Sequence, residues 1–224
     1  GNEQVGMGHI YRALTLAHEI IDHEIIFVTD RDNKDVVNTL VNYDYRLEVF
    51  TKQNIVLNIA NLMPDLVIND VLDTDKQDVT TLQSLGIRVM NFEDLGEGAT
   101  VADITINELY DVPRFQGGNV CWGKEYFFVR DEFVDASPCD FQANPGGLLL
   151  AFGGIDQHDL TRKIFFSIRD ICRERGIHIF IVTGPGYGAY GELADQVGGM
   201  NGVSLTHATG IISRIMEKVS LAIT

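Results

Sequence analysis

The sequence predicts an α/β protein made of two doubly wound halves, each built on a parallel sheet. Runs rich in β-branched residues alternate with segments of helical periodicity, and both halves carry a glycine loop before a helix. An irregular stretch over 107–145, with prolines and glycines, interrupts this rhythm. Short helices between strands favour right-handed βαβ units. We therefore expect a first domain over 1–143 and a second, partial domain over 144–224.

Each element of the first half follows from the spacing of its apolar residues. Apolar residues recurring every three or four positions predict helices over 9–22, 33–41, 53–62 and 74–85. Short β-branched or apolar runs between them predict strands over 24–29, 45–50, 65–69, 87–92 and 104–106, with a further short strand near 119–122.

The second half repeats the alternation in fewer residues. Strands are predicted over 147–152, 177–183, 203–205 and 219–224, and helices over 158–175, 189–197 and 210–217. Free-standing doubly wound domains usually need on the order of 100–150 residues, so we expect this half to be cut in mid-domain. The chain also opens on a glycine loop without the strand that normally precedes one, which suggests a piece of a longer polypeptide.

Composition narrows the classes of partner. The formal net charge of −15, from 32 acidic and 17 basic residues, argues against nonspecific nucleic-acid binding and against docking on anionic membranes. No apolar run reaches the roughly 18 residues of a membrane span, and no signal peptide is visible. The three cysteines, Cys121, Cys139 and Cys172, form no CxxC pair. Their number and spacing argue against a zinc site and against a disulfide framework, and they fit a reducing cytoplasm.

A glycine loop beside a histidine is the clearest functional signal. Gly6, Met7 and Gly8 lead into His9 at the first turn of the first predicted helix, with Arg12 one turn further on. Glycines let the backbone approach a ligand closely, and a helix N-terminus welcomes an anion. Histidine can act as a general base near neutral pH. An ordinary turn before a helix is the alternative, because such loops are common in α/β proteins.

Polar residues also follow several predicted strands, where open α/β sheets bind ligands. Asp70 closes one strand and could orient His9 or bind a substrate hydroxyl, or simply cap the next turn. Asp94 has the same two interpretations. Asn107 is expected mainly to hold the following loop through its side chain. In the second half, Gly153, Gly154 and Asp156 follow a strand in the same way.

An Asp-x-Asp pattern at Asp73 and Asp75 has two explanations. Paired carboxylates after a strand can hold a divalent metal that bridges to a nucleotide diphosphate. Aspartate is also a good helix N-cap, and we favour the cap. We expect no metal and no cofactor.

Beyond these signals, the chain resembles the GT-B-like UDP-sugar hydrolases of pseudaminic acid and spore coat polysaccharide biosynthesis. This family includes the UDP-2,4-diacetamido-2,4,6-trideoxy-beta-L-altropyranose hydrolases. The matching segments run in family order through nearly the whole chain. They are 6–9 with Arg12, Leu16 and Ala17, then 65–70, 91–95, 102–107, 121–126, 129–133, and 152–156 with Thr161. Two departures are Val71, where an aromatic residue is usual, and Glu93, where a second aspartate is frequent.

The resemblance implies a GT-B-like fold, in which two Rossmann-like domains face each other across a cleft that holds a UDP-sugar. It implies that the C-terminal domain binds most of the nucleotide and that His9 acts on the water that attacks the anomeric carbon. Asp70 and Asp94 would position His9 or the sugar. Residues expected to contact substrate are Gly6, Met7, Gly8, Arg12, Asn107, Gly153, Gly154 and Asp156.

The leading hypothesis is therefore a cytoplasmic hydrolase that releases UDP from an amino-deoxy-sugar nucleotide in nonulosonic acid or surface polysaccharide biosynthesis. A GT-B glycosyltransferase, with His9 activating an acceptor hydroxyl, is one alternative, because a fold does not fix a reaction. The other is a non-catalytic sugar-nucleotide-binding module, fused to or associated with another enzyme of the nonulosonic acid pathway.

Overall fold

The computed structural model describes residues 8–31, 40 and 43–224, with the side chain of Asp131 left aside. Within these residues the chain forms two compact units, His9–Phe128 and Val129–Thr224. The helix predicted over 33–41 falls almost wholly outside the described residues, as do Gly6 and Met7. Each unit is an α/β structure whose strands pair in parallel, which confirms the predicted Rossmann-like α/β class.

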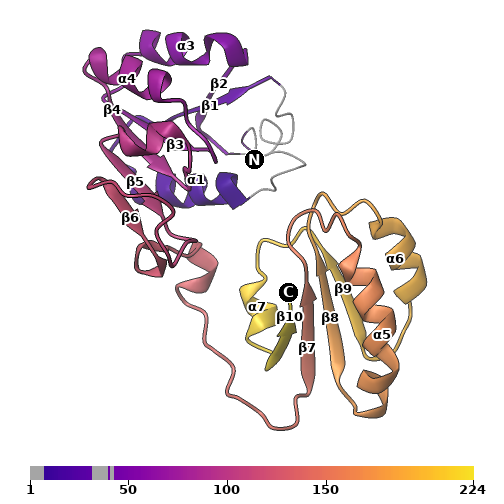
Figure 1. The fold of residues 1–224 in the computed structure, drawn as a ribbon. Coiled ribbons are helices and arrows are strands. Elements are labelled where there is room, and N and C mark those ends of the chain that lie inside the picture. Colours follow the sequence, from indigo (N-terminus) through magenta and orange to yellow (C-terminus); the bar gives the residue numbers. More distant parts are fainter. Residues whose placement is uncertain (1–7, 32–39, 41–42) are drawn as a thin grey trace. The chain divides into compact units, whose positions relative to one another are not determined.

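The first unit contains two groups of parallel strands (Figure 1). It begins with helix α1 (Gly8–Glu19), whose buried residues include Ile10, Leu14 and Ala17 on one face. Strands β1 (Ile26–Asp30) and β2 (Arg46–Phe50) pair with each other. A four-stranded sheet follows in chain order, from β3 (Leu66–Asp70), β4 (Arg88–Phe92), β5 (Ile104–Asn107) and β6 (Val120–Trp122).

Helices pack on the four-stranded sheet through a small apolar core. Helix α3 (Ile55–Asn61) follows the 3-10 turn η1 (Lys52–Asn54), and α4 (Lys76–Ser84) lies between β3 and β4. Val79 and Leu82 of α4 pack with Val67, Val89 and Ala102. Further 3-10 turns are η2 (Glu97–Thr100) and η3 (Lys124–Tyr126) in this unit, and η4 (Asp131–Phe133) in the next.

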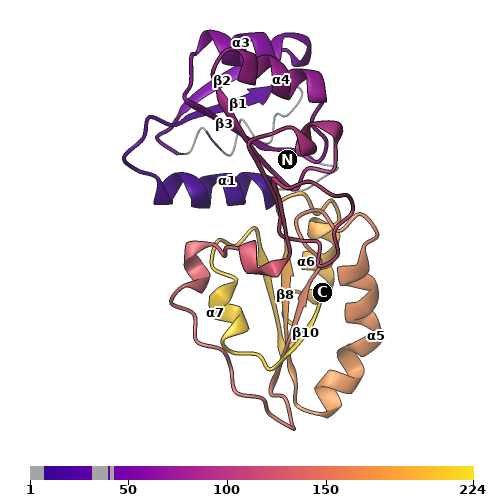
Figure 2. The ribbon, with the colours of Figure 1, turned by 60° about the vertical axis from the view of Figure 1, so that its left-hand side comes forward.

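The second unit is a four-stranded parallel sheet with the order β10-β7-β8-β9. Its strands are β7 (Gly147–Ala151), β8 (His178–Thr183), β9 (Val203–His207) and β10 (Leu221–Ile223). Helices α5 (Leu160–Glu174) and α6 (Tyr190–Val197) lie on one face of the sheet, and α7 (Ser213–Met216) lies on the other (Figures 1 and 2). Placement of helices on both faces makes this unit doubly wound.

Alternation along β7 explains the two covered faces of this sheet. Leu148 and Leu150 pack with Phe165 of α5 and Leu193 of α6, whereas Leu149 packs with Val182, Val219 and residues of the α7 segment. Successive side chains of a strand point to opposite faces, so a continuous leucine run serves two cores at once.

Several predicted elements are shorter in the structure. Helix 9–22 ends at Glu19, helix 210–217 spans only Ser213–Met216, and strand 219–224 spans only Leu221–Ile223. Ile21 extends the apolar pattern of the first helix, but it lies in a turn closed by the bond from His23 N to Ile20 O and is 78% exposed. No helix in the described part of the chain is long and apolar enough to cross a membrane.

Candidate active site

Strand register brings the polar strand ends of the first unit to one edge. Asp70, the last residue of β3, is aligned with Phe92 of β4, and Phe92 is aligned with Ile106 of β5. Glu93 and Glu108 come directly after β4 and after Asn107 of β5. The carboxyl ends of these parallel strands therefore present several acidic side chains side by side.

His9 joins this edge from the first turn of α1. Its Nδ1 atom makes a short contact with Oδ1 of Asp70, and both side chains are largely buried, at 13% and 12% exposure. The second residue of a helix lies beside N–H groups that have no partner within the helix. The pair therefore combines an imidazole, a carboxylate and the positive end of a helix dipole.

Arg12 holds Asp70 from one turn further along α1. Its Nε donates to Oδ2 of Asp70 at 2.8 Å, and its Nη2 donates to Oδ1 at 2.6 Å. Residues three apart on a helix share a face, so His9 and Arg12 reach the same carboxylate. This two-pronged contact restricts both the position and the rotation of the Asp70 carboxylate.

The remaining guanidinium nitrogen of Arg12 points to a second carboxylate. Nη1 donates to Oε1 of Glu108 at 2.8 Å and lies 3.9 Å from Oε1 of Glu93. The Glu93 and Glu108 side chains are each only 2% exposed, and the guanidinium lies 5.6 Å from the centre of the Phe92 ring. One arginine is therefore buried among Asp70, Glu93 and Glu108.

The cluster shifts the acidity of its members in different directions. Burial alone would raise the pKa of Asp70, but the hydrogen bonds and charges of His9 and Arg12 outweigh it, so the pKa lies below its ordinary value. Burial raises the pKa of Glu93, and the Leu109 N–H and the charge of Arg12 offset only part of that effect. For Arg12, the partners Asp70 and Glu108 outweigh burial and raise the pKa.

These partners determine which nitrogen of His9 is available. Asp70 with its lowered pKa is ionised at neutral pH, so its oxygens can only accept hydrogen bonds. The proton shared with His9 then belongs on Nδ1, and a neutral ring keeps a lone pair on Nε2. An imidazole fixed in this way by a buried carboxylate is suited to take a proton at Nε2.

Asp94 and Asn107 are held differently. The Asp94 carboxylate accepts from Thr74 N at 2.9 Å, Thr74 Oγ1 at 2.5 Å, Asn91 Nδ2 at 2.6 Å and Gly96 N at 2.8 Å. Asn107 Nδ2 donates to the backbone oxygen of Asp94 at 3.0 Å. Both residues are fully buried, and their contacts join the loops that follow β3 and β4 to the end of β5.

The Asp-x-Asp pattern serves as a helix cap, as the sequence predicts. Asp75 is the N-cap of α4, and its Oδ1 accepts from Gln77 N at 2.6 Å. In the part of the chain that the structure describes, no group of three or more His, Cys, Asp or Glu side chains is arranged to hold a metal ion.

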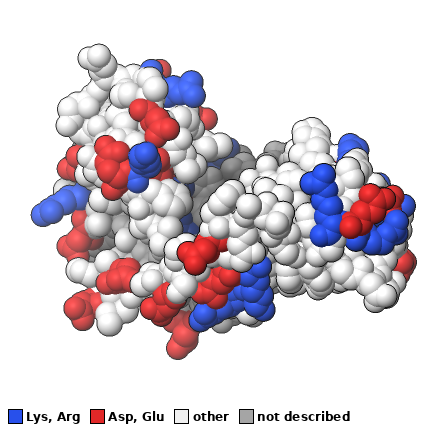
Figure 3. Space-filling view, turned by 90° about the horizontal axis from the view of Figure 1, so that it is seen from below, with Lys and Arg blue, Asp and Glu red and all other residues white. Residues whose placement is uncertain are grey.

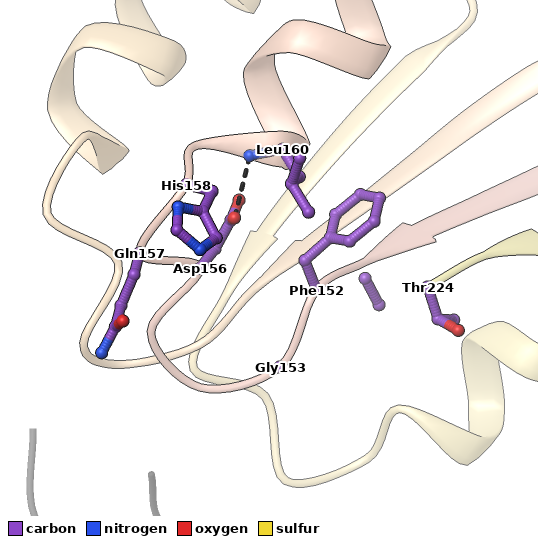
Figure 4. Close-up of a pocket in the computed structure, with 8 residues that line it drawn as sticks. Phe152, Gly153, Asp156, Gln157, His158, Leu160 and Thr224 are labelled. Atoms are coloured by element: carbon purple, nitrogen blue, oxygen red, sulfur yellow. Dashed lines mark hydrogen bonds between the residues drawn. The ribbon is translucent and has the colours of Figure 1, made fainter. Parts of the chain in front are cut away.

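In the second unit, the loop after β7 borders a hollow of about 390 Å³ (Figure 4). Gly153 has a φ of +74°, a conformation that glycine adopts without strain. Gly154 lies against another glycine, because a Cβ on Gly184 would come within 2.3 Å of its Cα. The two glycine turns at the ends of β7 and β8 thus pack backbone to backbone, and the bond from Gly186 N to Gly154 O closes the contact at 2.9 Å.

Asp156 caps the helix that starts beside this hollow. Its two carboxylate oxygens accept from Leu160 N and Thr161 N, each at 2.8 Å, and Figure 4 shows the first of these bonds. Nearby, Asp159 accepts from Tyr187 Oη at 2.5 Å and from Arg162 Nε at 2.7 Å. The carboxylate of Asp156 therefore already occupies backbone N–H groups at the α5 N-terminus that an anionic ligand would otherwise use.

Charged side chains are mixed on the face of the molecule seen in Figure 3. The described Lys and Arg side chains there lie next to Asp and Glu side chains.

Sequence reasoning singled out His9, Arg12 and Asp70, and the structure brings these three together. Sequence reasoning gave no role to Glu108, which accepts a hydrogen bond from Arg12 although the two residues are 96 positions apart. The one available signal was an acidic residue directly after the strand-end Asn107. Gly8 begins α1, and a Cβ there would meet no described atom within 4 Å.

Comparison with curated proteins finds one distant relative. The chain is 29% identical over 210 residues to the uncharacterized protein MJ1062 of Methanocaldococcus jannaschii. The alignment covers 86% of this chain and 43% of that protein, so the chain spans less than half the length of the curated relative it matches. No protein-family model matches the chain.

Proposed function

We propose that the chain is a nucleotide-sugar hydrolase that releases UDP from an amino-deoxy-sugar nucleotide, in nonulosonic acid or surface polysaccharide biosynthesis. The observation that carries the proposal is the contact of His9 Nδ1 with an Asp70 carboxylate that Arg12 clamps, because it leaves Nε2 as a base. The choice of a UDP-sugar comes from the ordered motifs of the sequence and the family they resemble.

In the proposed reaction, Nε2 of His9 takes a proton from water while the water oxygen bonds to the anomeric carbon. The bond between that carbon and the phosphate oxygen breaks, and its electron pair leaves with UDP. The products are the free sugar and UDP, and His9 then releases the proton to solvent. Asp70 stabilises the imidazolium formed during the step, as a buried carboxylate does for a catalytic histidine.

The proposal assigns the nucleotide to the second unit, as the family resemblance implies. Because Asp156 already caps α5, we expect the backbone of the Gly153–Gly154 turn to meet the diphosphate instead of that helix N-terminus. The three cysteines are free thiols, in keeping with the cytoplasm, where we place the reaction.

The experiment is a UDP-release assay on a panel of UDP-linked amino-deoxy sugars in ¹⁸O-labelled water. We expect the label in the anomeric hydroxyl of the sugar, because the bond to carbon is the one that breaks. His9→Ala should lower the rate by roughly 10²–10⁴-fold, the range for loss of a general base. His23→Ala, which removes an exposed imidazole from the turn after α1, is the matched control and should leave the rate unchanged.

The same assay separates the alternatives. An unchanged rate in His9→Ala refutes the role of the histidine as a base. Release that requires an added acceptor and yields a glycoside replaces the hydrolase with a glycosyltransferase. Binding of UDP-sugars without release by the wild type replaces it with a binding module.

A further inference from the structure

We propose that Glu108 is a positioning residue of this site: by holding Nη1 of Arg12, it aims the other two guanidinium donors at Asp70 and so fixes the tautomer of His9. The inference deepens the proposed function, because it rests on His9 acting as the base. In the part of the chain that the structure describes, Glu108 bonds to Arg12 and makes no hydrogen bond to His9 or Asp70, so its effect passes through Arg12.

The argument begins with the shape of the guanidinium group. It is planar and rigid, so fixing one nitrogen restricts the directions of the other two. Nε and Nη2 of Arg12 donate to Asp70, while Nη1 donates to Glu108 at 2.8 Å from another edge of the group. Two carboxylates, one at the end of β3 and one directly after β5, therefore determine the orientation of one arginine.

Burial makes Glu108 hard to replace as an acceptor. The Arg12 side chain is 12% exposed and the Glu108 side chain is 2% exposed, so bulk water has little access to this contact. Glu93 lies 3.9 Å from Nη1, beyond hydrogen-bond distance, and its Oε1 already accepts from Leu109 N at 3.2 Å. Without Glu108, the buried Nη1 group would lose its hydrogen-bond acceptor.

The charges around Arg12 also indicate Glu108 as its second partner. Three carboxylates surround a single arginine, and an ionised carboxylate with an unpaired buried oxygen is costly. Glu93 and Glu108 each have an Oε2 atom without a hydrogen-bond partner among the described residues, and burial raises the pKa of Glu93. The bond from Nη1 at 2.8 Å makes Glu108, and not Glu93 at 3.9 Å, the second carboxylate that Arg12 holds.

The consequence at His9 is a choice of tautomer. Nη2 of Arg12 lies 3.1 Å from Nδ1 of His9, and both atoms approach Oδ1 of Asp70. If Arg12 tilts, Asp70 loses its two-pronged restraint and can rotate away from Nδ1. The neutral ring is then free to carry its proton on Nε2, the form that cannot accept a proton there.

The test is a graded series of substitutions at position 108, read by NMR on the ¹⁵N-labelled protein without substrate. Long-range ¹H–¹⁵N correlations of the His9 ring report which nitrogen carries the proton. We expect the Nδ1-protonated population to fall in the order wild type, Glu108→Gln, Glu108→Leu, because glutamine keeps a weaker acceptor and leucine keeps none. Glu97→Gln, an exposed glutamate in η2, is the matched control and should match the wild type.

Kinetics give the second readout. We expect kcat for UDP release to fall about tenfold in Glu108→Gln and up to about a hundredfold in Glu108→Leu, with KM unchanged, since orientation of the base is lost. A His9 spectrum identical to wild type in Glu108→Leu overturns the proposal. If circular dichroism shows that Glu108→Leu does not fold, an identical spectrum in Glu108→Gln overturns it. The NMR arm needs no turnover, so it judges Glu108 even if the proposed hydrolase activity is absent.

Discussion

The carboxyl edges of the two sheets carry similar residues in different states. At the first edge, Asp70 is shared by His9 and Arg12, and the ring of His9 keeps one nitrogen outside the pair. At the second edge, both oxygens of Asp156 cap α5, and Asp159 is bonded to Tyr187 and Arg162. Position at a strand end is common to both edges, whereas the partners of each carboxylate decide what it can do.

The partners of these carboxylates distinguish a catalytic role from a structural one. A carboxylate that orients a histidine leaves a titratable atom available for proton transfer. A carboxylate that caps a helix accepts hydrogen bonds from backbone N–H groups with its oxygens and so stabilises the fold. The first edge is therefore our candidate for catalysis, and the second is our candidate for positioning the backbone that meets a nucleotide.

Among the substitutions considered, Arg12→Ala should cause the largest loss of stability, and it acts at the first edge. Loss of the arginine leaves Asp70 and Glu108 buried without their cation, and breaking a buried ion pair from one side costs about 3–5 kcal/mol. Urea unfolding of this variant and of the wild type measures the loss. A loss below about 1 kcal/mol, typical of exposed pairs, would show that the cluster is solvated.

Gly184→Ala should disturb the second edge through packing instead of charge. The added methyl group would lie 2.3 Å from Gly154 Cα and 2.4 Å from its backbone oxygen, which cannot move as a side chain can. Overpacking of this kind costs roughly 1–3 kcal/mol. Gly188→Ala is the control, because a Cβ there would meet no described atom within 4 Å. Equal unfolding midpoints for the two variants would refute the close approach of the turns.

Asp156→Ala tests the capping role at the same edge. Removal of a carboxylate that caps a helix N-terminus costs typically about 1 kcal/mol, and Asp156→Asn should recover part of this because an amide oxygen still accepts. Thermal unfolding followed by circular dichroism gives the order of the three proteins. An Asp156→Ala variant as stable as the wild type would mean that α5 does not depend on this cap.

Glu93→Gln should have the smallest effect, visible as a change with pH. Burial raises the pKa of Glu93 in the folded chain, so the folded state binds this proton more tightly than the unfolded state does. The stability that protonated Glu93 contributes is fully present below its ordinary pKa of 4.5, and it is lost as pH rises through the raised pKa of the folded state. We expect Glu93→Gln to gain stability relative to wild type as pH rises, measured by urea midpoints from about pH 4 to about pH 8. A constant difference would contradict the raised pKa.

Much of this fold was accessible from local sequence patterns. Alternation and helical spacing predicted the strands that end at Asp70, Phe92 and Asn107, because those signals are short-range. Asp75 was correctly predicted as a cap from the residues around it. The ends of α1 and α7 were less accessible, since tertiary packing decides how far an apolar pattern continues as a helix.

The buried contacts of Arg12 in the candidate site could not be predicted from local sequence patterns. The Arg12–Glu108 contact joins residues 96 positions apart, and no local pattern announces that a charge will be buried. Asp156 illustrates the converse, because its place after a glycine turn suggested a ligand contact while its oxygens bond to α5. Partners across the fold decide such roles, and composition or spacing alone does not reveal them.

The most direct test of the central claim compares two carboxylates of the same sheet. Asp70 lies at its carboxyl end, while Asp103 lies just before β5 and accepts from Val89 N at 2.8 Å, and both have a lowered pKa. In a single-turnover UDP-release assay, Asp70→Asn should slow the reaction by on the order of 10³–10⁴, because an amide favours the wrong tautomer of the histidine. Asp103→Asn should react at the wild-type rate. Equal rates for the two variants would contradict the account.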